Sequence, residues 1–112
     1  MDKRKFYQGE TAWFVIIPRG EMTEPRSLEA RVVERSGEVT AVFSSETEDE
    51  TLKIQKLTEG KWGFRLSPTL TASLLGEYWI ECWGVCSDTV YLLSRQRFRI
   101  CRSTRGETSF NN

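Results

Sequence analysis

The side chains that usually carry out chemistry in proteins are sparse in this chain. It has 112 residues and contains no histidine. Histidine is the commonest general base, the partner of catalytic serine and cysteine, and a frequent metal ligand. Its absence removes these sites together. We therefore predict a protein that is not an enzyme and has no cofactor and no structural metal.

The thiols do not restore a reactive site. The three cysteines are Cys82, Cys86 and Cys101. Cys82 and Cys86 are four positions apart, which is not the spacing of a redox motif or a zinc knuckle. Cys86 falls in a predicted turn without a histidine or nearby basic residue to lower the pKa of its thiol, so it is a poor nucleophile. We predict reduced thiols, with Cys82 buried as a small apolar residue.

Carboxylates are concentrated in one stretch, SSETEDE, at residues 44–50. Such oxygens bind calcium, but the stretch lacks the alternating acidic residues and central glycine of calcium loops. Glycoside hydrolysis needs two carboxylates held ~5–9 Å apart across a cleft on rigid elements, which a loop of adjacent acids does not provide. We predict a solvated acidic loop.

The balance of charges limits the kinds of partner that the chain is expected to bind. Sixteen basic residues offset sixteen acidic residues, and no basic segment dominates. Phosphate binding usually shows as a concentration of Lys and Arg, so we predict no nucleic acid and no membrane surface as a partner. The apolar run at residues 12–17 is shorter than a signal peptide core or the ~20 residues of a membrane span. We expect a soluble chain that is cytoplasmic during its synthesis.

Strand-like patterns run through the whole chain, so the residues discussed above are expected to lie on strands or on the loops between them. Short apolar or alternating segments are separated by turn signals at ~8–12 residue spacing, which is typical of an antiparallel sandwich or barrel. The segment SPTLTASLLG, with an early proline and a terminal glycine, instead predicts a short helical turn near residues 70–75. Strands are expected at residues 10–17, 28–35, 39–43, 51–57, 61–66, 77–83 and 89–100.

The last two strands raise a question about their second face. Alternation places Tyr78, Ile80 and Cys82 on one face of the strand, and Trp79 and Trp83 on the other. A strand with one face in water needs only one apolar set. We predict the inward set to be Trp62, Phe64, Leu66, Tyr78, Ile80, Cys82, Val90, Leu92, Phe98 and Ile100.

A register in which paired residue numbers sum to 174 keeps these faces consistent, because directly opposed residues share a face. It places Trp83 opposite Tyr91, Glu81 opposite Leu93, and Trp79 opposite Arg95, where a cation–π contact forms. The outer face would then carry an apolar cluster with a charged border. Its predicted members are Trp79, Trp83, Tyr91, Leu93 and Arg95.

Three interpretations of this cluster stay open. It is an interface with a protein partner or a second copy, it is covered by a loop or by Phe110 of the tail, or it is a platform for a ligand. A carbohydrate-binding module would use Trp79, Trp83 and Tyr91 to stack on sugar rings. The charged neighbours of the cluster suit a protein interface better than a sugar.

The order of motifs resembles a known family. The motifs are GET at residues 9–11, GFRLS at 63–67, LTASLLGEYWIEC at 70–82 and TVYLLSRQRFRI at 89–100. In this order they resemble the small immunoglobulin-like domains of tailed-phage structural proteins, including the N-terminal domain of baseplate upper proteins and related stand-alone prophage proteins. The resemblance covers residues 6–100. Baseplate proteins continue into further domains, whereas this sequence holds one.

The resemblance implies a fold and a role. The fold is an all-β, immunoglobulin-like antiparallel sandwich of seven to eight strands at residues 1–101, with a polar tail at 102–112. The role is a non-enzymatic structural or assembly module of phage or prophage origin, associated with the virion and binding virion proteins or itself. Immunoglobulin-like sandwiches also tie a crossover down through a tyrosine hydroxyl, so Tyr78 is either such a corner or an ordinary core residue.

Overall fold

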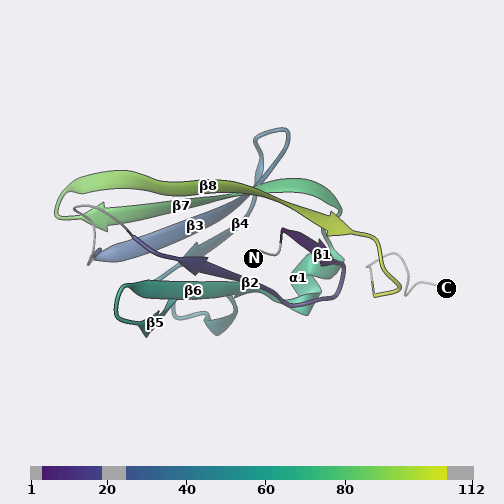
Figure 1. The fold of residues 1–112 in the computed structure, drawn as a ribbon, viewed down its shortest axis with the longest axis horizontal. Coiled ribbons are helices and arrows are strands. Elements are labelled where there is room, and N and C mark those ends of the chain that lie inside the picture. Colours follow the sequence, from purple (N-terminus) through teal and green to yellow (C-terminus); the bar gives the residue numbers. More distant parts are fainter. Residues whose placement is uncertain (1–3, 19–24, 106–112) are drawn as a thin grey trace.

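Two β-sheets pack face to face and enclose one core (Figure 1). The computed structural model describes residues 4–18 and 25–105. One sheet has five strands in the order β1–β8–β7–β3–β4, and the other has three in the order β2–β6–β5. The all-β sandwich predicted from the strand pattern is confirmed.

Apart from β1 and η1, which were not predicted, the elements lie close to their predicted positions. The five-stranded sheet contains β1 (Lys5–Tyr7), β3 (Ser27–Glu34), β4 (Val39–Ser44), β7 (Gly76–Cys86) and β8 (Thr89–Cys101). The three-stranded sheet contains β2 (Ala12–Ile16), β5 (Gln55–Thr58) and β6 (Lys61–Leu66). The short helices are η1 (Glu50–Leu52) and α1 (Pro68–Ala72).

The segment predicted as one strand at residues 51–57 is instead the 3-10 helix η1 followed by β5. The side chain of Asp49 caps η1 by accepting a hydrogen bond from the Thr51 backbone N–H at 2.9 Å. A capping carboxylate satisfies an N–H that has no partner within the helix. The start of the predicted strand is therefore helical because a local side-chain bond competes with strand pairing.

The helix α1 begins earlier than the predicted turn near residues 70–75 because Ser67 caps it. The Ser67 hydroxyl accepts a hydrogen bond from the Leu70 N–H at 3.2 Å, and Pro68 occupies the first turn. Proline is favoured there, since its fixed φ suits a helix and its missing N–H has no intrahelical partner. Gly76 then starts β7 with a φ of 101°.

One pairing in the described sheets departs from the antiparallel expectation. β1 runs parallel to β8, with Phe6 opposite Ile100. Phe6 is buried, and its ring lies 5.5 Å from that of Phe14 and 6.4 Å from that of Phe98. The first strand therefore adds an aromatic side chain to the core that joins the two sheets.

Most of the predicted core is confirmed. Phe64, Leu66, Tyr78, Ile80, Cys82, Phe98 and Ile100 are buried, and Trp62 is partly buried against them. The prediction is wrong for Val90 and Leu92, which are 60% and 50% exposed. The cause is an irregularity in the pairing of β7 with β8, described below.

Of the two alternatives left open for Tyr78, the structure shows the tie to the crossover. Its hydroxyl accepts a hydrogen bond from the Leu75 N–H at 3.0 Å and lies 3.2 Å from the Leu75 carbonyl oxygen, to which it donates. Behind it, the buried hydroxyl of Thr71 donates to the Glu10 carbonyl at 2.8 Å and accepts from the Gly9 N–H at 3.0 Å. Both ends of the crossover are thus bonded to backbone.

Candidate functional site

A β-bulge between Cys82 and Trp83 changes which residues share a face at the far end of the β7–β8 hairpin. The predicted sum of 174 is wrong: from Gly76 to Cys82 the paired numbers sum to 176, so Arg95 lies opposite Glu81 and Trp79 lies opposite Arg97. Beyond the bulge the sum is 175, and Trp83 lies opposite Leu92. Since opposed residues share a face, a change by one residue exchanges the faces of β8 from there on.

Two members of the predicted cluster are therefore wrong. Tyr91 lies opposite Gly84, on the face that carries Tyr78 and Ile80, so it does not join Trp83. Leu93 is partly buried and packs against the core. Trp79, Trp83 and Arg95 remain on the outer face, and the predicted platform of Trp79, Trp83 and Tyr91 is not formed.

Trp79 is covered by arginines of its own chain. The Arg95 guanidinium carbon lies 3.9 Å from the centre of the Trp79 ring, and that of Arg97 lies 5.3 Å from it. On its other side Trp79 pairs with Val33, which is 8% exposed. Trp79 is thus covered within the chain, by side chains of the adjacent strand β8 and not by the loop or tail that was considered.

Ion pairs hold Arg95 and Arg99 on this face. Arg95 Nε lies 3.2 Å from a carboxylate oxygen of Glu81, and a guanidinium nitrogen of Arg99 lies 2.9 Å from one of Glu77. The hydrogen bond from Arg99 lowers the pKa of the Glu77 carboxyl below its usual value. We call the charged side chains around Trp79 on this half of the outer face the charged lattice; they are Glu77, Glu81, Arg95, Arg97 and Arg99.

The other half of the outer face carries apolar side chains on β7 and β8, of which Val90 and Leu92 are exposed and Trp83 and Val85 partly so. We call Trp83, Val85, Val90 and Leu92 the ribbon patch. The bulged register pairs Trp83 with Leu92 and Val85 with Val90, so all four side chains lie on one face. Within the described chain, the covered indole N–H of Trp83 has no hydrogen-bond partner. The hairpin that carries the patch reaches one end of the molecule (Figure 1).

A second apolar surface lies on the outer face of the three-stranded sheet. We call Trp13, Val15 and Leu57 the β2 strip; they are 58%, 50% and 48% exposed. Leu57 lies over Gly63, because a Cβ added to Gly63 would be 2.8 Å from the Cδ1 of Leu57. Gly63 in turn pairs with Val15. The three side chains therefore form one surface.

The β2 strip was not predicted, although the sequence carries a signal for it. In AWFVI both sets of alternate positions are apolar, and Ala12, Phe14 and Ile16 fill the core. The remaining positions, Trp13 and Val15, must then face away from the core. This is the pattern that raised the question about Trp79 and Trp83.

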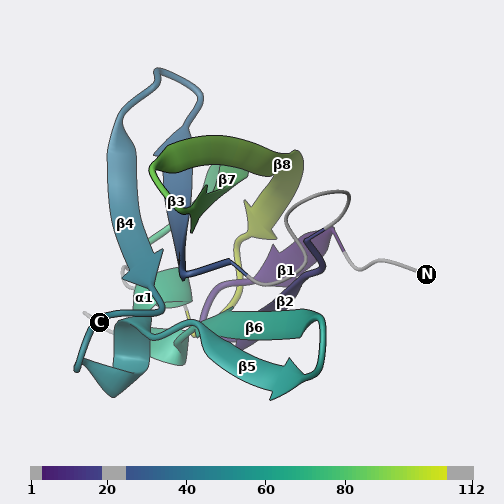
Figure 2. The same cartoon turned by 90° about the vertical axis from the view of Figure 1, so that its left-hand side faces the viewer.

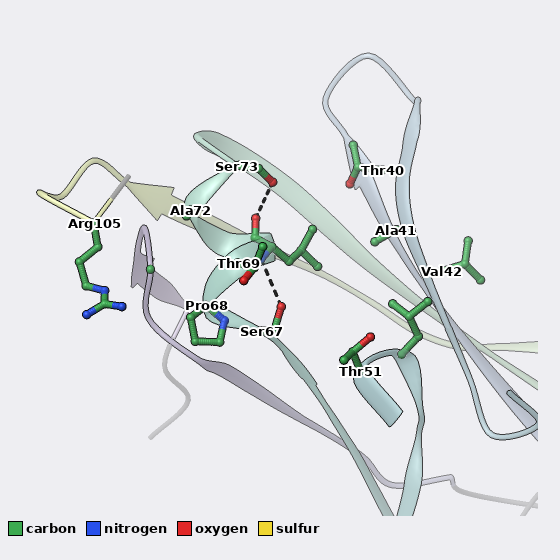
Figure 3. A pocket seen from close by; sticks show the side chains of 13 residues that line it. Thr40, Ala41, Val42, Thr51, Ser67, Pro68, Thr69, Ala72, Ser73 and Arg105 are labelled. Carbon is green, nitrogen blue, oxygen red and sulfur yellow. Dashed lines mark hydrogen bonds between the residues drawn. The ribbon is translucent and has the colours of Figure 1, made fainter. Parts of the chain in front are cut away.

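A cleft lies at the end of the sandwich beside α1 (Figure 3). Its volume is about 750 Å³, and β4, η1, the segment 67–73, Gly9 and Arg105 line it. Arg105 packs closely over Gly9, where a Cβ would be 2.3 Å from that of the arginine. Gly9 has a φ of 84°, so its lack of a side chain permits both the backbone turn and the close approach.

The groups with potential chemistry are dispersed. Cys82 is buried, and burial raises the pKa of its thiol, while Cys86 and Cys101 are partly buried free thiols. The carboxylates of Glu46, Glu48, Asp49 and Glu50 are exposed. Across residues 4–18 and 25–105, no three acidic or cysteine side chains are placed to hold a metal ion together.

Comparison with known proteins finds no protein-family model and no curated protein that matches the chain. Among the helices of the described residues, none has the length and apolar character needed to span a membrane. The possible covering of the outer face by Phe110 concerns a residue outside the described part of the chain.

Proposed function

We propose that the chain is a non-enzymatic assembly module that binds protein partners through the outer faces of its sheets. The observation that carries the proposal is the ribbon patch, where Val90 and Leu92 are at least half exposed beside Trp83. Extended apolar surfaces of this kind on a folded domain mark sites of interaction. Tryptophan is also enriched at the centres of protein interfaces.

The β2 strip extends the proposal to a second contact. The ribbon patch and the β2 strip lie on the outer faces of different sheets, so they point to opposite sides of the sandwich. A molecule with two such surfaces joins two neighbours, which is the geometry that an assembly module requires. The neighbours are other structural proteins or further copies of the chain.

The flank of the ribbon patch indicates the charge of its partner. Arg95 and Arg99 are paired with glutamates, whereas no ion pair involving Arg97 is found among the described residues. Arg97 lies over Trp79, and the Glu81–Arg95 pair separates it from the patch. A partner with an acidic group at the border of its apolar surface fits this arrangement.

The resemblance to immunoglobulin-like domains of tailed-phage proteins supports placing this role in a phage or prophage particle.

The surroundings of the tryptophans on β7 argue against a sugar platform. Arg95 covers the ring of Trp79, and Tyr91 faces the other way from Trp83. A sugar ring stacks on an open aromatic face, which Trp79 does not offer.

The experiment is co-expression with the products of the neighbouring genes, followed by co-purification. Leu92→Glu should disrupt the partner held at the ribbon patch and lower its affinity at least ~10-fold, equivalent to ~1.4 kcal/mol. Val15→Glu should disrupt the partner held at the β2 strip. Leu75→Glu is the matched control, since Leu75 is 46% exposed and lies in neither surface.

Surface plasmon resonance with the purified partners measures the affinities, and sedimentation velocity measures self-association of the chain alone. Phage origin predicts that the neighbouring genes encode tail or capsid proteins. The proposal is overturned if the chain is a monomer that binds none of these products. It is also overturned if Leu75→Glu weakens binding as much as the two test substitutions.

A further inference from the structure

The free edge of β4 has the composition of a strand that accepts another strand. β4 is the last strand of the five-stranded sheet (Figure 2). Its sequence, VTAVFS, contains no charged residue and no proline. Proteins commonly protect an edge strand with lysine or proline, since its unpaired N–H and C=O groups otherwise recruit a further strand. β4 carries neither protection.

The hydrogen bonds at the end of β4 show which of its backbone groups face outward. The Ser45 N–H donates to the Leu28 carbonyl on β3 at 3.0 Å, so alternate residues of β4 bond to β3. The preceding residue, Ser44, faces the other way. Its carbonyl points away from β3 and accepts a hydrogen bond from the Ile54 N–H at 3.0 Å. By the same alternation, the N–H and C=O of Val42 point outward.

The chain itself already pairs with this edge once. Ser44 and Lys53 form an isolated parallel bridge, after which the chain leaves to form β5 in the other sheet. The edge is therefore competent for strand addition at Ser44. At Val42, one outward-facing position further along, the edge borders the cleft instead of another strand.

The side chains of the cleft offer few free polar groups. Ser67 caps α1, Ser73 donates to the Leu70 carbonyl, and Thr51 donates to Asp49. Thr40 donates to the Val32 carbonyl. Because these hydroxyls are engaged within the chain, the wall presents mainly apolar side chains and the backbone of Val42. A main chain with apolar side chains matches that surface.

Arg105 adds a charge at the other end of the cleft. Of the residues lining the cleft it alone is charged, and no ion pair is found for it in the described chain. Figure 3 shows its side chain on the side of α1 away from Thr40 and Val42. A ligand that extends from β4 past α1 therefore needs a carboxylate at this end.

We propose that the cleft binds an extended peptide segment of a partner protein, which adds a strand to β4 and places a carboxylate beside Arg105. A free segment fits better than the β4 of a second folded copy. In an antiparallel pairing of two β4 strands centred on Val42, Glu38 of each copy would oppose Glu46 of the other, and like charges in opposed positions are destabilising. The η1 and α1 segments beside each β4 would also have to be accommodated.

Strand addition depends mainly on backbone groups, so a simple synthetic peptide is a sufficient probe. We would use fluorescein-labelled Thr-Val-Thr-Val-Thr-Asp with a free terminal carboxylate and follow its binding by fluorescence anisotropy. One control peptide replaces the aspartate by an asparagine amide. A second carries N-methyl groups on both valines, which removes two backbone donors while the side chains stay.

We expect saturable binding of the first peptide, binding at least ~5-fold weaker without the carboxylates, and none for the N-methylated peptide. Arg105→Ala should remove the difference between the first two peptides. Val42→Pro should abolish binding, because it deletes an outward N–H while leaving the bonds to β3 in place. Circular dichroism checks that both variants keep their β structure.

The peptide should also shift the backbone amide resonance of Val42. Absence of saturable binding overturns the proposal, as does equal binding of the N-methylated peptide. Leu92→Glu and Val15→Glu should leave peptide binding unchanged, since they lie on the outer faces. The peptide site and the proposed assembly surfaces can therefore fail independently.

Discussion

The two tryptophans on the outer face of β7 differ in what surrounds them. Trp79 is held between Arg95 and Val33, and the ion pair of Arg95 with Glu81 fixes the arginine over the ring. Trp83 lies beyond the bulge, among side chains that solvent reaches. Tryptophan on one face of a strand thus packs under charged side chains in one case and lies, partly exposed, beside the exposed Val90 and Leu92 in the other.

This difference predicts separate effects of substitution. Trp79→Ala should lower the free energy of unfolding by about 2 kcal/mol, because it removes a partly buried indole together with its cation–π contact. Leu92→Ala should change the stability by less than ~0.5 kcal/mol, as exposed positions usually do. Urea denaturation measures both. A neutral Trp79→Ala that weakens partner binding would show instead that Trp79 belongs to the interface.

At the scale of elements, α1 and the connections around it are fastened by side-chain bonds to backbone. Thr71 bonds α1 to the link between β1 and β2, and Tyr78 bonds β7 to the chain that enters it. The five-residue α1 is too short to be stable alone. These bonds, with the packing of Leu74, hold it across the end of the sandwich.

Removing these hydrogen bonds should lower the free energy of unfolding by unequal amounts. Thr71→Val keeps the side-chain shape but leaves the Gly9 N–H and the Glu10 carbonyl without their partner, so we expect a loss of about 1–3 kcal/mol. Tyr78→Phe should cost about 1 kcal/mol for the same reason. Thr69→Val is the control, because Thr69 is exposed. Thermal denaturation followed by circular dichroism measures the three variants, and equal midpoints would contradict this account.

The elements also show how far the sequence predicts the fold. The inward face of β7 followed from its alternation, and β6 has its predicted bounds. The register of β7 with β8 could not be predicted, because residues 90–93 (VYLL) are all apolar and any register gives Trp83 an apolar partner. The bulge that sets the register cannot be recognised in a run of apolar residues. Likewise β1 has three residues and one buried side chain, too little to show a pattern.

At the scale of the whole molecule, one long hairpin determines the shape. The longest extent is 51 Å, and β8 has 13 residues. At ~3.3 Å per residue this strand alone spans ~43 Å. The hairpin therefore reaches almost from end to end, with the core and the charged lattice on one part and the ribbon patch on another. The core and the surface proposed to bind a partner therefore occupy different lengths of the same two strands.

The parallel pairing of β1 with β8 has a mechanical consequence. Lys5 lies beside Arg99 and Tyr7 beside Cys101, so tension applied before β1 and after β8 pulls the two strands past each other along their length. Their hydrogen bonds must then break together, whereas tension that separates Glu77 from Arg99 opens the antiparallel β7–β8 pair one bond at a time. In single-molecule force spectroscopy, handles at residues 4 and 102 should give a higher unfolding force than handles at 77 and 102. Equal forces would contradict the shear geometry.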